Sequence, residues 1–147
     1  MEALLTTYYD YHWEANERYI NLIKQTKTPP ERAIFLMSHI LNAQQIWLNR
    51  ISPNGKKVGV WEEHAPDSMA NLNMEQYKRA ITLLAENDLS EIITYQNTQG
   101  QTYTNSIRDI LLHIVNHGTY HRGQLALLFR AADIAPPNTD YIFYRRE

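Results

Sequence analysis

The stretch LLHIVNHGTYHRGQLALLF, residues 111–129, is the densest apolar run in the chain. Within it His113, His117 and His121 recur at every fourth residue. On an α-helix this spacing places each imidazole about 6 Å further along the axis and about 40° around it, so all three lie on one face. The stretch therefore predicts a long helix that carries a row of imidazoles.

A row of this kind limits how a metal ion can be bound. Two histidines four residues apart can bind one cation together. Three cannot on a straight helix, because His113 and His121 lie about 12 Å apart along the axis, whereas ligand nitrogens lie about 2.1 Å from a zinc ion. The helix offers one chelating pair, His113 with His117 or His117 with His121. A third ligand must come from another segment.

The length and composition of the chain limit the classes of protein to which it can belong. A chain of 147 residues is typical of a single domain, here residues 1–147. The formal charge is −2 without a basic run, so nucleic acid is not an expected partner. No cysteine is present, which excludes disulfides and a thiol nucleophile and leaves histidine and carboxylate as metal ligands. Without a leader or a membrane-length apolar run, we expect a cytoplasmic protein that does not contact membranes.

Helical periodicity recurs in three further segments. Apolar residues spaced by three and four predict a helix over residues 2–25. Thr28 as a cap, with Pro29 and Glu31 after it, predicts the start of a second helix that continues to about residue 51. Asn73 and Gln76 resemble a cap pair, which predicts a third helix ending near residue 87.

The remaining segments are connections and a tail. Residues 56–72 form an irregular loop, and long loops are often functional. Ile93 and Tyr95 before Gln99-Gly100, with Tyr103 after it, predict a small hairpin. Thr104 or Ser106 then caps the helix that contains the histidines, which runs to about residue 132. Residues 136–144 form an extended tail, whose apolar end at residues 141–144 should form a homodimer surface.

Four amphipathic helices predict an all-α bundle, and bundles build metal sites from side chains on facing helices. The ferritin-like di-iron class needs Glu-x-x-His on two helices. No glutamate here precedes a histidine by three residues, so that class is excluded. His39 lies within the apolar face of the second helix and is therefore well placed to supply a ligand.

The segment His113-Ile-Val-Asn-His117-Gly-Thr-Tyr-His121-Arg-Gly-Gln resembles the signature of the DinB family, which is named for induction by DNA damage. His39 on the second helix and the ending Pro136-Pro137-Asn138-Thr139-Asp140-Tyr141 also resemble that family, and residues 56–72 resemble it least. The resemblance implies an up-down-down-up four-helix bundle. It implies a divalent ion held by His39, His117 and His121, with water completing the coordination shell.

Other side chains near this motif are candidates for supporting the ligands or touching a substrate, namely His12, His113, Asn116 and Gln124. For His12 alone, a hydrogen-bonded core residue is the more common role. Gln124 shares the face of His121. Arg122 points about 100° away from His121, which favours a salt bridge to another helix or subunit. Gly118 and Gly123 weaken a helix interior, which predicts close packing of a neighbouring helix at both positions.

Three histidines with an open coordination position are typical of a catalytic site. Imidazole ligands suit zinc or nickel, and also iron or copper. Relatives of this superfamily include bacillithiol transferases and mycothiol-dependent maleylpyruvate isomerases. Together with the lack of a carboxylate at motif spacing, this favours a metal-dependent thiol S-transferase acting on a small molecule. The alternatives are a metal-dependent hydrolase, and a non-catalytic metal-stabilised bundle that serves as a binding or stress-response module.

Overall fold

The computed structural model describes residues 2–146. Its elements, in chain order, are α1 (Glu2–Gln25), α2 (Glu31–Ile51), α3 (Pro66–Glu86), β1 (Ile92–Gln96), β2 (Thr102–Ser106), α4 (Ile107–Ala131) and α5 (Tyr141–Tyr144). The four long helices form a bundle and the two strands pair as one antiparallel hairpin. The predicted all-α bundle with a small hairpin before the last long helix is confirmed. No helix within residues 2–146 combines the length and the apolar character that crossing a bilayer requires.

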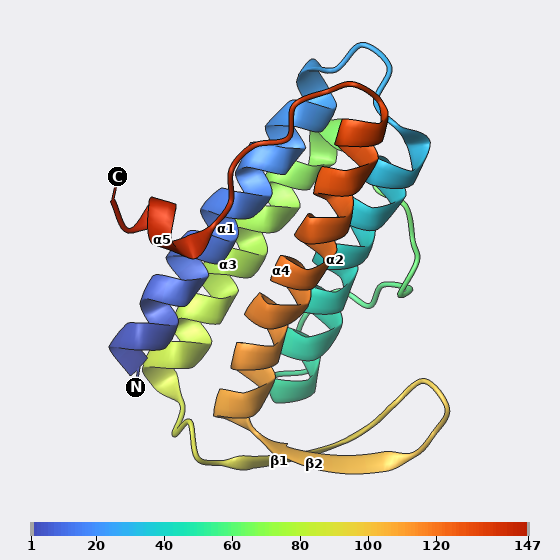
Figure 1. The fold of residues 1–147 in the computed structure, drawn as a ribbon. Helices are drawn as coiled ribbons and strands as arrows, with labels where there is room; N and C mark the ends of the chain where they lie inside the picture. The colour runs from blue at the N-terminus through green and yellow to red at the C-terminus, as the bar shows by residue number, and fades with distance from the viewer. Residues whose placement is uncertain (1, 147) are drawn as a thin grey trace.

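The helix directions explain the longest connection. α1 and α4 run one way along the bundle, whereas α2 and α3 run the other way (Figure 1). α1 packs chiefly against α3, and α2 packs chiefly against α4. Since α2 and α3 are parallel, residues 52–65 must return along the length of the bundle before α3 can begin. This crossover passes beside α2 and carries residues that later complete the candidate site.

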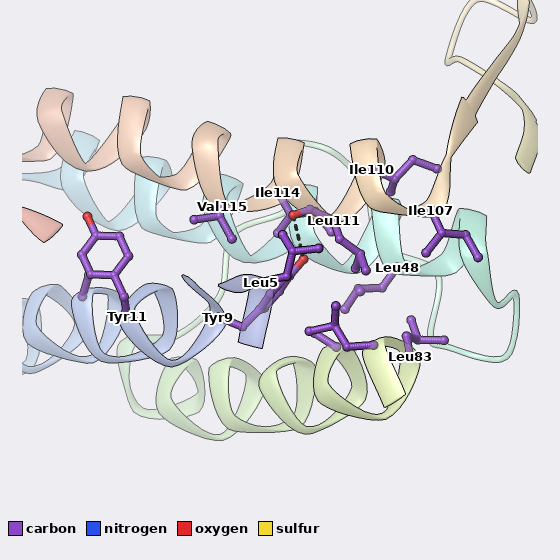
Figure 2. Packing of buried hydrophobic residues seen from close by; sticks show 13 residues of the cluster. Leu5, Tyr9, Tyr11, Leu48, Leu83, Ile107, Ile110, Leu111, Ile114 and Val115 are labelled. Carbon is purple, nitrogen blue, oxygen red and sulfur yellow. Dashed lines mark hydrogen bonds between the residues drawn. The ribbon is translucent and has the colours of Figure 1, made fainter. Parts of the chain in front are cut away.

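Apolar side chains form two separate clusters. The first lies toward the hairpin end and includes Tyr9, whose hydroxyl donates a 3.0 Å hydrogen bond to the Leu111 carbonyl (Figure 2). The second lies toward the other end and includes Met37 and Phe129. Each buried leucine, isoleucine or phenylalanine contributes about 1.5–3 kcal/mol relative to an exposed one. The two clusters supply most of the stability of the bundle.

A layer of buried polar side chains lies between the two clusters. We call it the polar layer, and it comprises His12 and Asn16 from α1, Gln44 from α2, Asn73 and Gln76 from α3, and Arg122 from α4. Buried polar groups cost free energy unless they are hydrogen-bonded. Here they bond across helix boundaries, as when Gln76 Nε2 donates to the Leu41 carbonyl at 3.0 Å. The polar layer therefore joins all four helices.

Two helix starts differ from the sequence-based prediction. α2 begins at Glu31 after Pro30, and the capping box expected from Thr28 does not form. α3 begins at Pro66, so the loop predicted for residues 56–72 ends seven residues earlier. Asn73 and Gln76 resembled a cap because such amides often bond to local backbone, but in the fold they bond across helices.

The cap of α4 agrees with one of the two predicted positions. The Ser106 hydroxyl accepts a hydrogen bond from the Asp109 N–H at 3.1 Å and donates one to its carboxylate at 2.7 Å. The first N–H groups of a helix have no acceptor within the helix, so this pair satisfies the Asp109 N–H.

Gly100 occupies the turn of the hairpin with a φ of 77°, a backbone conformation that glycine adopts without steric cost.

The tail returns to the bundle along α1. The Tyr11 hydroxyl donates to the Thr139 carbonyl at 2.7 Å, and the Tyr141 ring stacks on Tyr8 with centroids 4.9 Å apart. The tail is extended only as far as Asp140, since residues 141–144 form the short helix α5 rather than continuing as predicted. Ile142 and Phe143 remain exposed. The homodimer expected from this tail stays a prediction.

The two glycines of α4 have different surroundings. A Cβ at Gly118 would collide with His12 Cε1 and would lie 3.0 Å from Arg122 Nη1. The close packing predicted there is confirmed. A Cβ at Gly123 would meet nothing within 4 Å, so the same prediction for Gly123 is wrong. Gly118 is needed for the approach of α1, whereas Gly123 borders open space.

These two positions form a matched test of the packing. We expect Gly118→Ala to lower the free energy of unfolding by about 1–3 kcal/mol, because the new methyl displaces the His12 ring. Gly123→Ala should raise it by about 0.5–1 kcal/mol through higher helix propensity alone. Urea unfolding followed by circular dichroism measures both. Equal effects of the two substitutions would contradict the packing described here.

Candidate metal centre

The fold brings three histidines together from two helices. His39 lies on α2 and faces His117 and His121 on α4, with ring centroids 5.0 Å and 4.7 Å away. One ring nitrogen from each residue can be chosen so that all three lie within 4.8 Å of one another. The Nε2 atoms of His117 and His121 are 3.1 Å apart. This group could hold a metal ion.

Hydrogen bonds from the other ring nitrogens orient two of these imidazoles. His39 Nδ1 lies 3.1 Å from the Val60 carbonyl oxygen, and His121 Nδ1 lies 2.8 Å from Gln124 Oε1. Both partners are acceptors, so each Nδ1 carries the proton and donates. Metal-bound histidines usually have such a partner, which fixes the tautomer and the ring orientation. Both residues thus keep Nε2 unprotonated, which is the form that binds metal.

The crossover loop also covers the histidine group. The Trp61 ring stacks on His39 with centroids 4.0 Å apart and planes 15° apart, and Phe35 also stacks on Trp61, with centroids 5.1 Å apart. Asn42 Nδ2 donates to the Glu62 carbonyl at 2.7 Å, which ties the loop to α2. The loop therefore supplies both an acceptor and an aromatic cover to His39. Its length predicted a functional loop, but only the crossover path places it beside His39.

The electrostatics favour neutral imidazoles. Burial lowers the pKa of His117 to about 3, and the neighbouring His121, His39 and His113 act in the same direction. Burial also lowers the pKa of His39, although the bond to Val60 opposes this shift. Protonation would place several positive charges within one small volume. Because only neutral imidazole binds a metal, the lowered pKa values keep the ligands available at neutral pH.

The donor set fits a divalent transition metal. Two nitrogens bound tetrahedrally at about 2.1 Å from one zinc ion lie about 3.4 Å apart, close to the separation of His117 and His121 Nε2. Within residues 2–146, no cysteine and no carboxylate joins this group of three histidines. Three imidazoles without a fourth protein ligand leave a coordination position for solvent or substrate.

The other candidate residues fall in different places. Gln124 contacts His121, as described above. His113 does not belong to the group, although its ring lies 5.7 Å from the His117 ring; it packs on Trp47, with ring centroids 4.7 Å apart. Asn116 is exposed and lines a cavity on the other side of α4. The structure therefore places Gln124 and His113 beside a candidate ligand, and Asn116 away from the group.

His12 lies in the polar layer. Its Nδ1 is 3.1 Å from Arg122 Nη1, and its Nε2 is 3.0 Å from Gln44 Oε1. Arginine can only donate, so Nδ1 accepts and Nε2–H donates to Gln44. Burial and the Arg122 charge lower the pKa of His12 to about 3, which keeps this tautomer neutral. His12 thus serves the helix interface as a hydrogen-bonded core residue.

The partners of the Arg122 guanidinium differ from those predicted. It is 1% exposed and, among residues 2–146, it forms no salt bridge. Its guanidinium donates to Asn16 Oδ1 at 2.8 Å, His12 Nδ1 at 3.1 Å and Thr119 Oγ1 at 3.0 Å. The expected salt bridge is wrong because neutral acceptors of the polar layer surround this position. Sequence could not show this, since Asn16 and His12 are more than 100 residues away.

Comparison with known proteins agrees with the motif. The model of the DinB family matches residues 24–147. The chain belongs to the DinB family. It is also similar to the curated Protein DinB of Bacillus subtilis (strain 168), with 26% identity across 92% of this chain and 90% of that protein. The resemblance stated from the motif is thereby confirmed, and this DinB-family chain carries the histidine group at the position the motif indicates.

Metal content of single alanine variants tests the ligand set. We expect His39→Ala, His117→Ala and His121→Ala each to lose the ion, because each removes a nitrogen of the group. His113→Ala should retain it, since this residue packs on Trp47. Plasma emission spectrometry of the purified variants measures the content. Retention in all four variants would remove the site, and loss from His113→Ala with retention in His121→Ala would show that the wrong pair was chosen.

Gln124 should influence the ion through His121. Replacement by leucine removes the acceptor of His121 Nδ1–H, and losses of this kind lower metal affinity by about 10–100-fold. Gln124→Glu keeps an acceptor at the same position and serves as the matched control. Competition with a chromogenic chelator gives the affinities. If the leucine and glutamate variants bound metal equally, the orienting role of Gln124 would be disproved.

Proposed function

We propose that this DinB-family protein binds one divalent transition-metal ion, zinc or nickel, through His39, His117 and His121, and acts as a metal-dependent thiol S-transferase on a small molecule. The observation that supports this most directly is the convergence of three imidazoles from α2 and α4. Two of them have their second ring nitrogen already engaged by Val60 and Gln124. Such a donor set suits a site that keeps one position for substrate.

A bound ion of this class lowers the pKa of a coordinated thiol or water. The chain itself holds the imidazoles neutral, orients them through Val60 and Gln124, and covers His39 with Trp61. In the proposed reaction the thiol sulfur forms a bond to a carbon of an electrophile. The leaving group departs with the bonding electron pair, and the thiol proton passes to solvent.

The composition of the group favours thiol chemistry over hydrolysis. Hydrolysis by activated water is usually assisted by a positioned general base such as a carboxylate. In the described part of the chain no aspartate or glutamate belongs to the histidine group. A thiol, whose ordinary pKa of about 8.5 is far below that of water, needs less assistance. Thiol transfer therefore fits these residues better.

A fluorogenic assay separates the transferase from the hydrolase. Metal-loaded protein is mixed with cysteine or glutathione as the thiol and monochlorobimane as the electrophile, and p-nitrophenyl acetate serves as the hydrolase substrate. We expect conjugation above the uncatalysed rate, and its loss in His117→Ala. His113→Ala is the matched control that should retain activity. Ester cleavage without thiol conjugation would contradict the proposal.

The same variant distinguishes a catalytic ion from a structural one. If the ion is catalytic, His117→Ala keeps its helical circular dichroism and most of its stability, because the two apolar clusters hold the bundle together. If the ion is structural, its removal costs much of the fold, since its binding free energy is then folding free energy. Thermal unfolding of wild type with and without chelator gives the answer. A large drop in melting temperature on chelation would favour the non-catalytic alternative.

A further inference from the structure

A cavity of about 880 Å³ lies on the side of α4 away from the histidines. It is open to solvent and lined by α1, α4 and the tail, including Tyr8, Tyr19, Thr119, Gly123, Ala126 and Pro137. Residues 119 and 126 lie about 160–200° around α4 from His117. The cavity is therefore separate from the candidate metal centre, and its size falls within the range of small-molecule sites.

A buried guanidinium forms part of the wall of this cavity. Arg122 lines it and is 1% exposed. Within residues 2–146 its Nε has no hydrogen-bond partner, and no carboxylate forms an ion pair with it. The contact from its Nη2 to the Tyr11 hydroxyl is long, at 3.5 Å. A buried charge without a counter-charge is costly, so an anion in the cavity would compensate it.

The rest of the lining indicates the other part of a ligand. Arg130 is a second cation, whereas Asp140 is the only acid among the lining residues. Aromatic and apolar side chains cover much of the remaining wall, including Tyr8, Tyr141 and Leu112. Tyrosine rings offer flat apolar surface with a polar edge. The walls thus suit a flat apolar body that carries a negative charge.

The tail holds this cavity closed on one side. Thr139 accepts the hydrogen bond from Tyr11, and Arg18 Nη1 donates to the Asn138 carbonyl at 3.2 Å. Tyr141 packs edge-on against Tyr11, with centroids 5.3 Å apart. The tail is thereby fixed to α1 through residues 138, 139 and 141, so the cavity beneath it is part of the fold.

We infer that this cavity is a second binding site, for an organic anion with a flat apolar body such as an aromatic carboxylate, in which Arg122 and Arg130 attract the charge and the tyrosines contact the body. The site is independent of the metal-dependent function proposed above. Because a carboxylate can also bind a metal ion, the test must separate the two locations.

Calorimetric titration with 1-naphthoate and its neutral analogue 1-naphthamide tests the inference. We expect one naphthoate per chain, with naphthamide binding weaker by about tenfold or more, equivalent to about 1.4 kcal/mol. Chelated protein and His117→Ala should bind naphthoate as well as wild type does. Loss of binding in both would place the ligand on the metal. Equal affinities of the two probes, or no binding at millimolar concentration, would also overturn the inference.

Gly123 provides the blocking variant. Since a Cβ there meets nothing within 4 Å, Gly123→Leu should fold and place its side chain in the cavity, which should abolish naphthoate binding. Ala131→Leu adds the same side chain at an exposed position of α4 outside the lining and should bind normally. Unchanged binding in Gly123→Leu would contradict the location.

Charge variants test the role of the arginines. Arg122→Gln should weaken naphthoate by about tenfold or more while leaving naphthamide unchanged. If Arg122→Gln does not fold, Arg130→Gln carries the test, because it removes an exposed charge. We expect it to weaken naphthoate by about twofold to fivefold, as exposed ion pairs do. Equal losses for both probes would show that charge plays no part.

Discussion

The hydrogen-bond requirement of buried polar groups organises the middle of this bundle. Two apolar clusters stabilise its ends, and between them the polar layer must satisfy itself across helix boundaries. Arg122 meets His12 and Asn16 there, and Gly118 leaves the space that this approach needs. Because each of these side chains has its partner on another helix, the polar layer sets which faces of the helices meet.

The direction of α3 determines the path of the crossover loop. Since α2 and α3 are parallel, the chain between them must return along the bundle, and this brings Val60 and Trp61 to His39. The histidine group thus depends on three segments: α2, α4 and the crossover loop. A bundle with short connections throughout would leave His39 without its carbonyl acceptor or its aromatic cover.

Two opposite faces of α4 border different parts of the molecule. The face of α4 that carries His117 and His121 meets α2, while the opposite face borders the cavity under the tail. Between them Arg122 joins the cavity wall to His12 and hence to the polar layer. The three candidate metal ligands do not line the cavity, so each environment can be altered by substitutions that leave the other in place.

The sequence by itself determined the helical class, the family, the hairpin and the residues that could hold an ion, because spacing along one helix and a specific motif are local properties. It also indicated Ser106 as a cap, since that bond closes within three residues. Only the tertiary structure decided the start of α3, the neutral surroundings of Arg122 and the open space at Gly123. The surroundings of Arg122 and Gly123 depend on where segments distant in the chain lie, and Asn73 and Gln76 also bond across helices. Asn73 shows the reason, since an amide that can cap a helix can equally bond across one, and only the neighbouring helix decides which.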